Sequence, residues 1–331
     1  MVAERISIAQ AADIFRLHAH RIAVVAHVNP DGDAIGSGLA VVHITHALGK
    51  EAWLSFSYPE QVPETLQRIP GAVDIVTPEE MPSELDFLVV VDCGSADRMG
   101  RLADIADTVP YTLVLDHHRS NNGFGTHSVI RPHDDATAQI IIDFADALEV
   151  PIDPIIAECL YSAIVTDTGC FRWGSPRAHY DAARMLEQGI DGRAITRQLL
   201  DSHPFSYLQF KSRILERAVL EKDACEGRGL VWAPITYTEY KQIRPEAASA
   251  LIDELRTVQE AEVAAVFREM TPGRWTGSLR SHTDVNVAEV AIQFGGGGHR
   301  RAAGFTSDLT LTETVAKVRD ILSEPPLYRG D

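Results

Sequence analysis

Residues that can bind a metal ion follow three short apolar segments of this chain. His27 ends the segment IAVVAH, Asp92 ends FLVVVD, and Asp116, His117 and His118 end TLVLDHH. If these segments are strands of one parallel sheet, their carboxyl ends lie along one edge, so we expect the side chains to converge there. Imidazole and carboxylate groups together suit Mn²⁺, Fe²⁺, Co²⁺ or Mg²⁺ better than a metal that prefers thiolates. The spacing therefore predicts a metal centre.

Two loops add acidic residues to this set. The segment NPDGDAIGS places Asp31 and Asp33 after the first strand, in a turn that Pro30 and Gly32 favour. Asp167, in TDTG, stands where a predicted helix stops. Five carboxylates at one site would repel one another and raise one another's pKa values, so divalent cations are the simplest way to neutralise them. A pair of such ions would clamp a phosphoryl group and activate water near neutral pH.

Each of these residues also has a purely structural explanation. A single Asp at the end of a strand is more often a turn former or a helix N-cap than a ligand. His27 taken alone is more often a buried core residue. His117 and His118 are adjacent, so in an extended strand they point to opposite sides and at most one is an obvious ligand. The convergence of separate segments is what favours the metal centre.

A second group of chemically active residues lies near the end of the sequence. The run Gly295–Gly298 lacks side chains, so its backbone amides can approach a phosphate or a base closely. A lone glycine run is more often a flexible turn. Here His299, Arg300 and Arg301 follow it, and Arg280 ends a predicted strand. Cations gathered in an acidic chain favour an anion-binding site, although Arg300 and Arg301 are also compatible with ordinary surface charge.

The elements that would position these groups form an α/β pattern. In the first half, short β-branched segments alternate with helical ones, as in a parallel, doubly wound sheet with helices on both faces. The predicted strands are Ile22–Val25, Trp53–Phe56, Phe87–Val91 and Leu113–Leu115, and the predicted helices are 35–48, 137–148, 155–165 and 177–187.

A connector helix and a smaller α/β domain are predicted for the second half. The connector helix starts at His203 and continues to about Glu221, with Leu208, Leu215 and Val219 as its apolar stripe. Strands then follow at 229–233, 263–268 and 274–280, and helices at 247–258, 287–294 and 312–322. We therefore expect a catalytic domain over residues 1–200, a connector over 201–224 and a substrate-binding domain over 225–331.

Composition limits the classes of partner. The chain has 331 residues, enough for two domains, and a formal charge of −17, which disfavours a broad basic surface for long duplex DNA. No apolar run approaches the ~20 residues of a membrane span, and the first residues lack a secretion signal, so we expect a cytoplasmic protein without a membrane partner. The four cysteines form no CxxC pair, and we interpret them as reduced, buried thiols; they are Cys93, Cys159, Cys170 and Cys225.

Several of these segments resemble a known family. HVNPDGDAIGS, VVVDCGS, LDHHRSN and TDTGCF are similar, in this order, to the four motifs of the DHH phosphoesterase superfamily. SLRS and FGGGGHRRAAG resemble its glycine-rich DHH-associated domain, and the resemblance spans about residues 20–310. The size and the two-domain layout are most similar to bacterial enzymes that are both oligoribonucleases and 3′-phosphoadenosine 5′-phosphate phosphatases. Some members of that group act on cyclic di-AMP or its linear product.

This resemblance implies a role for each residue of the metal centre. Two Mn²⁺ ions are implied, with Mg²⁺ or Co²⁺ as substitutes. One ion would be held by His27, Asp31 and Asp92, and the other by Asp33, Asp92, His117 and Asp167, so that Asp92 bridges them. Asp116 would orient a histidine ligand, and His118 would donate to the scissile phosphate. Cys170 stands where relatives usually have Ser, at a position that is not a ligand.

The resemblance also implies how the second domain works. It would bind the nucleotide end of the substrate through Arg280, Ser281, Gly296, Gly297, Gly298 and His299. A homodimer is implied as well. The predicted protein is then a Mn²⁺-dependent phosphohydrolase that cleaves short oligoribonucleotides and adenosine 3′,5′-bisphosphate to mononucleotides, with cyclic di-AMP or its linear product as further candidate substrates.

Two alternatives remain open at this point. A manganese inorganic pyrophosphatase or polyphosphatase shares the metal-site motifs, but it usually carries an Arg/Lys-rich second domain, and FGGGGH disfavours it. A metal-dependent nucleotide-binding protein without turnover is the other alternative. The intact set of ligand residues disfavours it, because a binding protein does not need a bridged pair of ions.

Overall fold

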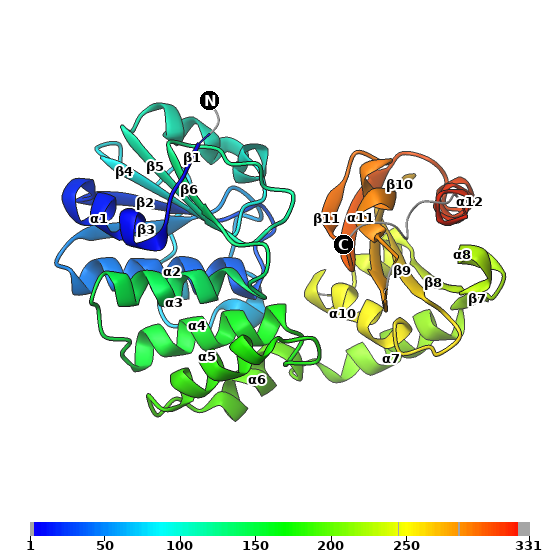
Figure 1. Cartoon of the computed structure of the whole chain (residues 1–331). Helices are drawn as coiled ribbons and strands as arrows, with labels where there is room; N and C mark the ends of the chain where they lie inside the picture. The colour runs from blue at the N-terminus through cyan, green and yellow to red at the C-terminus, as the bar shows by residue number, and fades with distance from the viewer. Residues whose placement is uncertain (1–2, 244, 284, 324–331) are drawn as a thin grey trace. The chain divides into compact units, whose positions relative to one another are not determined.

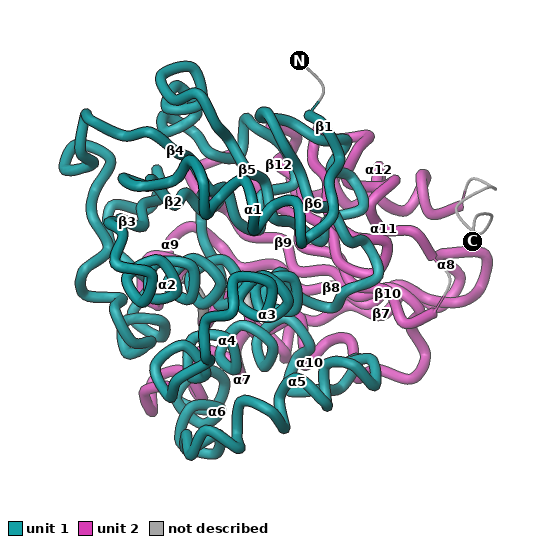
Figure 2. The backbone as a smooth tube through the Cα atoms, turned by 60° about the vertical axis from the view of Figure 1, so that its left-hand side comes forward, with its two compact units in different colours: residues 1–202 teal, residues 203–331 magenta. Residues whose placement is uncertain are grey.

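The computed structural model describes residues 3–243, 245–283 and 285–323 (Figure 1). Contacts between residues divide the chain into two compact units, Met1–Ser202 and His203–Asp331, which Figure 2 colours separately. We call them unit 1 and unit 2. None of the helices among the described residues is long and apolar enough to cross a membrane.

Unit 1 contains a six-stranded sheet in which every pair of neighbouring strands is parallel. Its strands are β1 (Glu4–Arg5), β2 (Arg21–Val25), β3 (Glu51–Ser55), β4 (Phe87–Val91), β5 (Tyr111–Asp116) and β6 (His127–Ile130), in the spatial order β1-β6-β5-β4-β2-β3. After β2 the chain goes to one side to form β3, and it then returns to the other side of β2 to form β4. The order therefore reverses between β2 and β4, the place where α/β sheets bind their ligands.

The helices of unit 1 cover one face of this sheet. They are α1 (Ile8–His18), α2 (Gly32–Ala47), α3 (Thr137–Ala147), α4 (Pro154–Asp167), α5 (Pro176–Leu186) and α6 (Gly192–Leu200). Figure 1 shows α2 and α3 against the sheet, with α4, α5 and α6 beyond them. Ile22 and Val24 of β2 pack into this main core, whereas Ala23 and Val25 point into a smaller core on the opposite face. The 3₁₀ segment Ala96–Asp107 covers this opposite face of the sheet. The predicted parallel α/β sheet is confirmed, with 3₁₀ turns in place of regular helices on this second face.

Unit 2 is a smaller, mostly antiparallel sheet with helices on both faces. Its strands are β7 (Val219–Glu221), β8 (Leu230–Ile235), β9 (Val263–Thr271), β10 (Arg274–Ser281), β11 (Gly297–His299) and β12 (Ala302–Ser307), in the order β11-β12-β10-β9-β8-β7. Its helices are α7 (Phe205–Glu216), α8 (Ala224–Gly227), α9 (Tyr237–Tyr240), α10 (Pro245–Leu255), α11 (Val287–Ile292) and α12 (Leu311–Leu322). Leu279 and Phe305 pack with α11 and α12, while Ala264 and Val266 pack with α7 and α10.

The connector helix differs from the prediction. Helix α7 ends at Glu216, because the chain then forms strand β7. Its buried side is made of Tyr207, Phe210 and Ile214, and the predicted stripe residue Leu208 is 58% exposed. Both sets of residues fit a helical period, so the sequence pattern alone does not decide between them.

One other prediction was wrong, and several short elements were missed. Cys170 is exposed, because it lies in the loop after α4 rather than in an element, while the other three cysteines are buried as predicted. Strands β1, β6, β11 and β12 and helices α1 and α6 were not predicted. The missed strands are short or rich in glycine and polar residues, so they lack the apolar run that identifies the central strands.

Candidate metal centre

The loops after β2, β4 and β5 bring the predicted residues of unit 1 together at the reversal point of the sheet. Asp92 lies at the centre of this set and follows β4 directly, with its side chain 2% exposed. Its backbone has a φ of 52°, in the left-handed region that Asp and Asn tolerate better than most residues. Its Oδ2 lies 3.4 Å from Nε2 of His27, and its Oδ1 lies 3.5 Å from Nε2 of His117 and 3.6 Å from Nδ1 of His118.

Asp31 and Asp33 are positioned by the start of helix α2. Asp31 is the N-cap, and its Oδ1 accepts hydrogen bonds from the amides of Asp33 and Ala34. Asp31 is therefore a helix N-cap, which is the purely structural role considered for it above. Its side chain is also half-exposed. The same oxygen lies 3.9 Å from Nε2 of His27. Asp33 lies one residue into the helix and is buried, with Oδ2 3.8 Å from Nε2 of His117.

Helix α3 presents its first turn to the two buried carboxylates. The amide of Thr137 donates to Oδ2 of Asp33 at 2.6 Å, and the amide of Ala138 donates to Oδ1 at 3.1 Å. The hydroxyl of Thr137 donates to Oδ1 of Asp92 at 3.0 Å. Hydrogen bonds from a helix N-terminus stabilise negative charge, so α3 holds both carboxylates in place. Sequence reasoning missed Thr137, because a Thr at the start of a helix carries no sign of this role.

His117 and Asp167 complete one side of the centre. Nε2 of His117 lies 3.4 Å from Oδ2 of Asp167, and Nδ1 of His117 lies 3.1 Å from the backbone carbonyl of Asp134. That carbonyl can accept only from Nδ1–H, so Nε2 faces the carboxylates and can bind a metal ion once it has released its proton. Asp167 is the last residue of α4, as predicted. A helix C-terminus disfavours a negative charge, so this carboxylate needs a cation nearby.

Asp116 holds His118 rather than His117. Oδ1 of Asp116 lies 2.7 Å from Nδ1 of His118, and Oδ2 accepts from the side-chain amide of Asn121 at 2.7 Å. Asn121 also donates to the carbonyl of Cys93, and it links the loops after β4 and β5. The residue that orients His117 is instead Asp134, through its backbone, which no side-chain pattern can show. Asn121 could have been found, because it lies in the quoted segment LDHHRSN.

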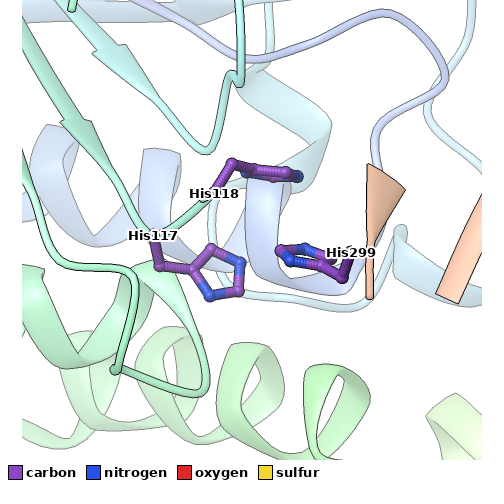
Figure 3. A group of neighbouring side chains, drawn as sticks. All are labelled: His117, His118 and His299. Atoms are coloured by element: carbon purple, nitrogen blue, oxygen red, sulfur yellow. The ribbon is translucent and has the colours of Figure 1, made fainter. Parts of the chain in front are cut away.

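The two adjacent histidines do not point in opposite directions. Their rings lie 5.0 Å apart at 71°, and Figure 3 shows both extending from the same loop. Strand β5 ends at Asp116, so the alternation of an extended strand does not apply to His117 and His118. Both rings therefore reach Asp92.

The charges of this cluster do not balance without cations. Burial and the neighbouring Asp92 raise the pKa of Asp33 to about 7. Burial also raises the pKa of Asp167 well above its usual range, and the nearby aspartates add to this effect. Burial lowers the pKa of the histidines, but the carboxylates outweigh it and raise the pKa of His27 to about 9 and that of His117 to about 10. Protons thus occupy positions that divalent cations would take.

The donor set fits two neighbouring divalent ions. Ligand atoms lie within 4.8 Å of one another in the groups His27–Asp31–Asp92 and Asp33–Asp92–His117. Both groups contain Asp92 and offer only oxygen and nitrogen, which suits Mn²⁺, Co²⁺ or Mg²⁺. Asp92, Asp116 and His118 form a further group of the same kind.

In unit 2, strand pairing places Arg280 and His299 on one side of the sheet. Arg280 of β10 and His299 of β11 both lie opposite Ala302 of the strand between them, β12. Directly paired residues of antiparallel strands point to the same face, so the two cationic side chains share a face about 10 Å apart across two strand spacings. Ser281 ends β10, and its hydroxyl donates to the carbonyl of Val285.

The glycine run is partly explained by strand packing. A Cβ at Gly296 would lie 2.2 Å from the carbonyl oxygen of Gly304, and one at Gly298 would lie 2.5 Å from that of Ala302. These two glycines allow β11 to approach β12. A Cβ at Gly295 or Gly297 would meet nothing within 4 Å, so these two positions leave open space beside the backbone.

Comparison with known proteins places both units in one family. The DHH family, N-terminal domain, matches residues 21–164, and the DHHA1 domain matches residues 233–324. The chain is 30% identical to the bifunctional oligoribonuclease and PAP phosphatase NrnA of Thermus thermophilus over 95% of this chain and 92% of that protein. It is 22% identical to the cyclic-di-AMP phosphodiesterase GdpP of Bacillus subtilis over 92% of this chain and 47% of that longer protein.

A solved structure shares the fold over nearly the whole chain. It is an exopolyphosphatase-related protein from Bacteroides fragilis, with a TM-score of 0.85, 23% identity and coverage of 95% of each chain. The motifs, the cluster around Asp92 and these matches agree. The chain belongs to the DHH family of phosphoesterases and is a hydrolase that acts on phosphoric esters.

Proposed function

We propose that this protein is a metal-dependent phosphohydrolase that degrades very short oligoribonucleotides and adenosine 3′,5′-bisphosphate to mononucleotides. The carboxylate cluster that shares Asp92 between two ligand groups is the observation that carries the proposal. The names of the similar NrnA proteins support the substrate class. We also propose Mn²⁺ as the metal, the cytoplasm as the location and a homodimer as the working form.

The residues of unit 1 divide into metal ligands and a proton donor. His27, Asp31 and Asp92 would hold one ion, and Asp33, Asp92, His117 and Asp167 would hold the other. When bound, such a pair neutralises the carboxylates, polarises a phosphoryl group and activates water.

His118 is available as the donor. Burial lowers the pKa of His118, but its hydrogen bond to Asp116 and the charge of Asp92 outweigh burial and raise it above its usual value. A protonated His118 can donate to a phosphate oxygen, and Asp116 keeps the ring oriented.

Unit 2 would supply the affinity for nucleotides. Arg280 and His299 share a face of its sheet, and guanidinium and imidazolium groups are well suited to phosphate. Gly297 leaves room for a ligand beside the backbone. Together with Ser281, Gly296 and Gly298, these residues are the proposed substrate-binding set.

A substrate panel tests the activity. Adenosine 3′,5′-bisphosphate, linear and cyclic di-AMP, pyrophosphate and RNAs of two to ten nucleotides are assayed with Mn²⁺, Mg²⁺ and Co²⁺. We expect turnover of the bisphosphate and of the shortest RNAs, with rates that fall as length increases. Turnover of pyrophosphate alone would show a pyrophosphatase. Tight nucleotide binding without turnover under any metal would show a binding protein, and either result refutes the proposal.

Arg280→Ala tests the role of unit 2. A charged hydrogen bond contributes about 1.5–3 kcal/mol, so kcat/KM for a dinucleotide should fall roughly 10- to 150-fold. Bis(p-nitrophenyl) phosphate has no nucleotide end, and its hydrolysis should be nearly unchanged. Arg274→Ala is the matched control, because Arg274 begins the same strand and, among the residues that the structure describes, forms its ion pair with the exposed Asp308. Equal losses on both substrates would mean that Arg280 serves the fold or the metal centre.

A further inference from the structure

A cavity on unit 1, distinct from the metal centre, is lined by helices α4 and α6. It has a volume of about 490 Å³, which lies in the range of pockets that bind small organic molecules. Its lining residues are Tyr161, Gly192, Arg193, Thr196, Arg197 and Asp201. Arg193, Thr196 and Arg197 are spaced by three and four residues, so they share one face of α6, while Ile195 and Leu199 bury the other face.

Tyr161 brings a hydroxyl to this cavity. The residue is 6% exposed, and its ring packs near that of Phe171. A Cβ at Gly192 would lie 2.8 Å from the Tyr161 hydroxyl, so the absence of a side chain at Gly192 lets α6 lie against this group. Within the described residues the hydroxyl makes no hydrogen bond, and it is not enclosed in the core but is open to the cavity. The hydroxyl is thus available to a ligand in the cavity.

Arg193 and Arg197 carry unbalanced positive charge. They stand four residues apart on α6, where two like charges repel each other. Neither of them forms an ion pair with a carboxylate in the part of the chain that the structure describes, although the protein has a formal charge of −17. By contrast, Arg184 on the preceding helix is paired with Asp146. Both arginines are exposed, so they leave a local positive charge beside the cavity, and such a charge favours an anion.

We propose that this cavity binds the phosphate group of a small phosphate ester of about the size of a nucleoside monophosphate. Arg193 and Arg197 would contact the phosphate oxygens, since guanidinium groups match phosphate geometry, and the hydroxyls of Tyr161 and Thr196 would donate to them. Asp201 at the same cavity accepts hydrogen bonds only, so it selects a ligand whose remainder carries amino or hydroxyl donors. The proposal is independent of the hydrolytic activity.

Calorimetric titration of the full-length protein without metal tests this site. Metal is left out so that no ion at the metal centre can hold phosphate and dominate the signal. AMP, inorganic phosphate and adenosine are the three ligands. We expect AMP to bind, inorganic phosphate to compete with it, and adenosine to show no measurable binding. Equal affinity for AMP and inorganic phosphate would mean that the phosphate alone is recognised and would still support the site. Adenosine binding as tightly as AMP would overturn it.

Single and double substitutions test whether AMP binds at this cavity. Arg193→Ala/Arg197→Ala should raise the Kd for AMP about 10-fold or more, and Tyr161→Phe should raise it about fivefold, as expected for charged and neutral hydrogen bonds. Arg68→Ala is the control, because Arg68 is also exposed and unpaired within the described residues of unit 1. Tyr161→Phe should leave the melting temperature without ligand unchanged or slightly higher, because no protein hydrogen bond is lost.

Two further binding results would overturn the proposal. One is the absence of AMP and phosphate binding to the wild-type protein. The other is wild-type affinity in both Tyr161→Phe and the double arginine variant, with loss of binding only in Arg280→Ala, which would assign the phosphate to unit 2. A melting temperature of Tyr161→Phe well below that of the wild type would show that the hydroxyl has a structural role instead.

Discussion

Replacing Asp92 by Asn is the sharpest perturbation of the proposed centre. The substitution keeps the shape of the side chain and the left-handed backbone, because Asn adopts that region as readily as Asp. It removes the one charge that both ligand groups share. If each ion loses a charged contact of about 1.5–3 kcal/mol, the total loss is about 3–6 kcal/mol, or roughly 10²- to 10⁴-fold in metal affinity. Turnover should fall by several orders of magnitude, because activation of water and charge neutralisation are lost together.

The assay compares Asp92→Asn with Asp86→Asn. Asp86 lies just before strand β4, at the opposite end from Asp92, and its Oδ1 accepts the amides of His20 and Arg21. An Asn oxygen can accept the same bonds, so the control should keep its metal and its rate. Bound manganese is measured by elemental analysis after dialysis. The rate of hydrolysis is measured with bis(p-nitrophenyl) phosphate, and the fold is checked by circular dichroism. An Asp92→Asn protein that retains two ions and a near-normal rate would refute the shared carboxylate.

Three further predictions concern individual groups of the site. His117→Ala should lower the metal content. His118→Ala should keep the metal, but its rate should fall about 10²- to 10⁴-fold because the proton donor is missing. Equal metal loss in both variants would contradict this division of roles. Thr137→Val should reduce kcat about 10-fold, while Thr45→Val, whose hydroxyl bonds only within its own helix, should have no effect on kcat. Metal binding should release protons, because carboxylates outweigh burial and raise the pKa of His27 to about 9 and that of His117 to about 10. Both rings are cations at pH 7 without metal, so metal affinity should increase with pH until the rings lose their protons, at about pH 9 for His27 and about pH 10 for His117. Calorimetry in buffers of different ionisation enthalpy measures the release, and a pH-independent affinity would contradict it.

The central strands could be predicted because they are buried on both faces. Strand β4 begins and ends at the predicted residues, Phe87 and Val91, since a fully buried strand is an unbroken apolar run. Strand β6 could not be found in this way, because it has only four residues and includes His127 and Ser128. Helix α1 could have been found, since Ser7 and Gln10 form a capping box that the sequence displays.

The side chains of the candidate site could be predicted from the sequence, but the contacts between them could not. Strand ends identify His27, Asp92 and His117, because the edge of a parallel sheet is fixed by chain direction. The pairing of β2 with β4, which sets His27 beside Asp92, is not visible in the order of the elements, since β3 lies between them in sequence. The rule of alternation failed at His118 for a similar reason, because the strand stops at Asp116 before the rule can apply.

The contribution of helix α3 explains why hydrogen bonds alone cannot complete this site. Asp33 accepts from the amides of Thr137 and Ala138 and from the hydroxyl of Ser37, and donors of this kind lower the pKa of a carboxyl group. Burial and the charge of Asp92 nevertheless raise the pKa of Asp33 to about 7. The donors that the fold supplies therefore do not offset the cost of holding these carboxylates together. The positive charges that the described side chains offer nearby include the imidazolium groups of His27 and His117 and, beside His27, the guanidinium of Arg98. A divalent ion would displace the imidazolium protons and add stabilisation. The amino end of helix α3 orients the carboxylates, while the negative charge that it leaves uncompensated is what would attract a metal ion.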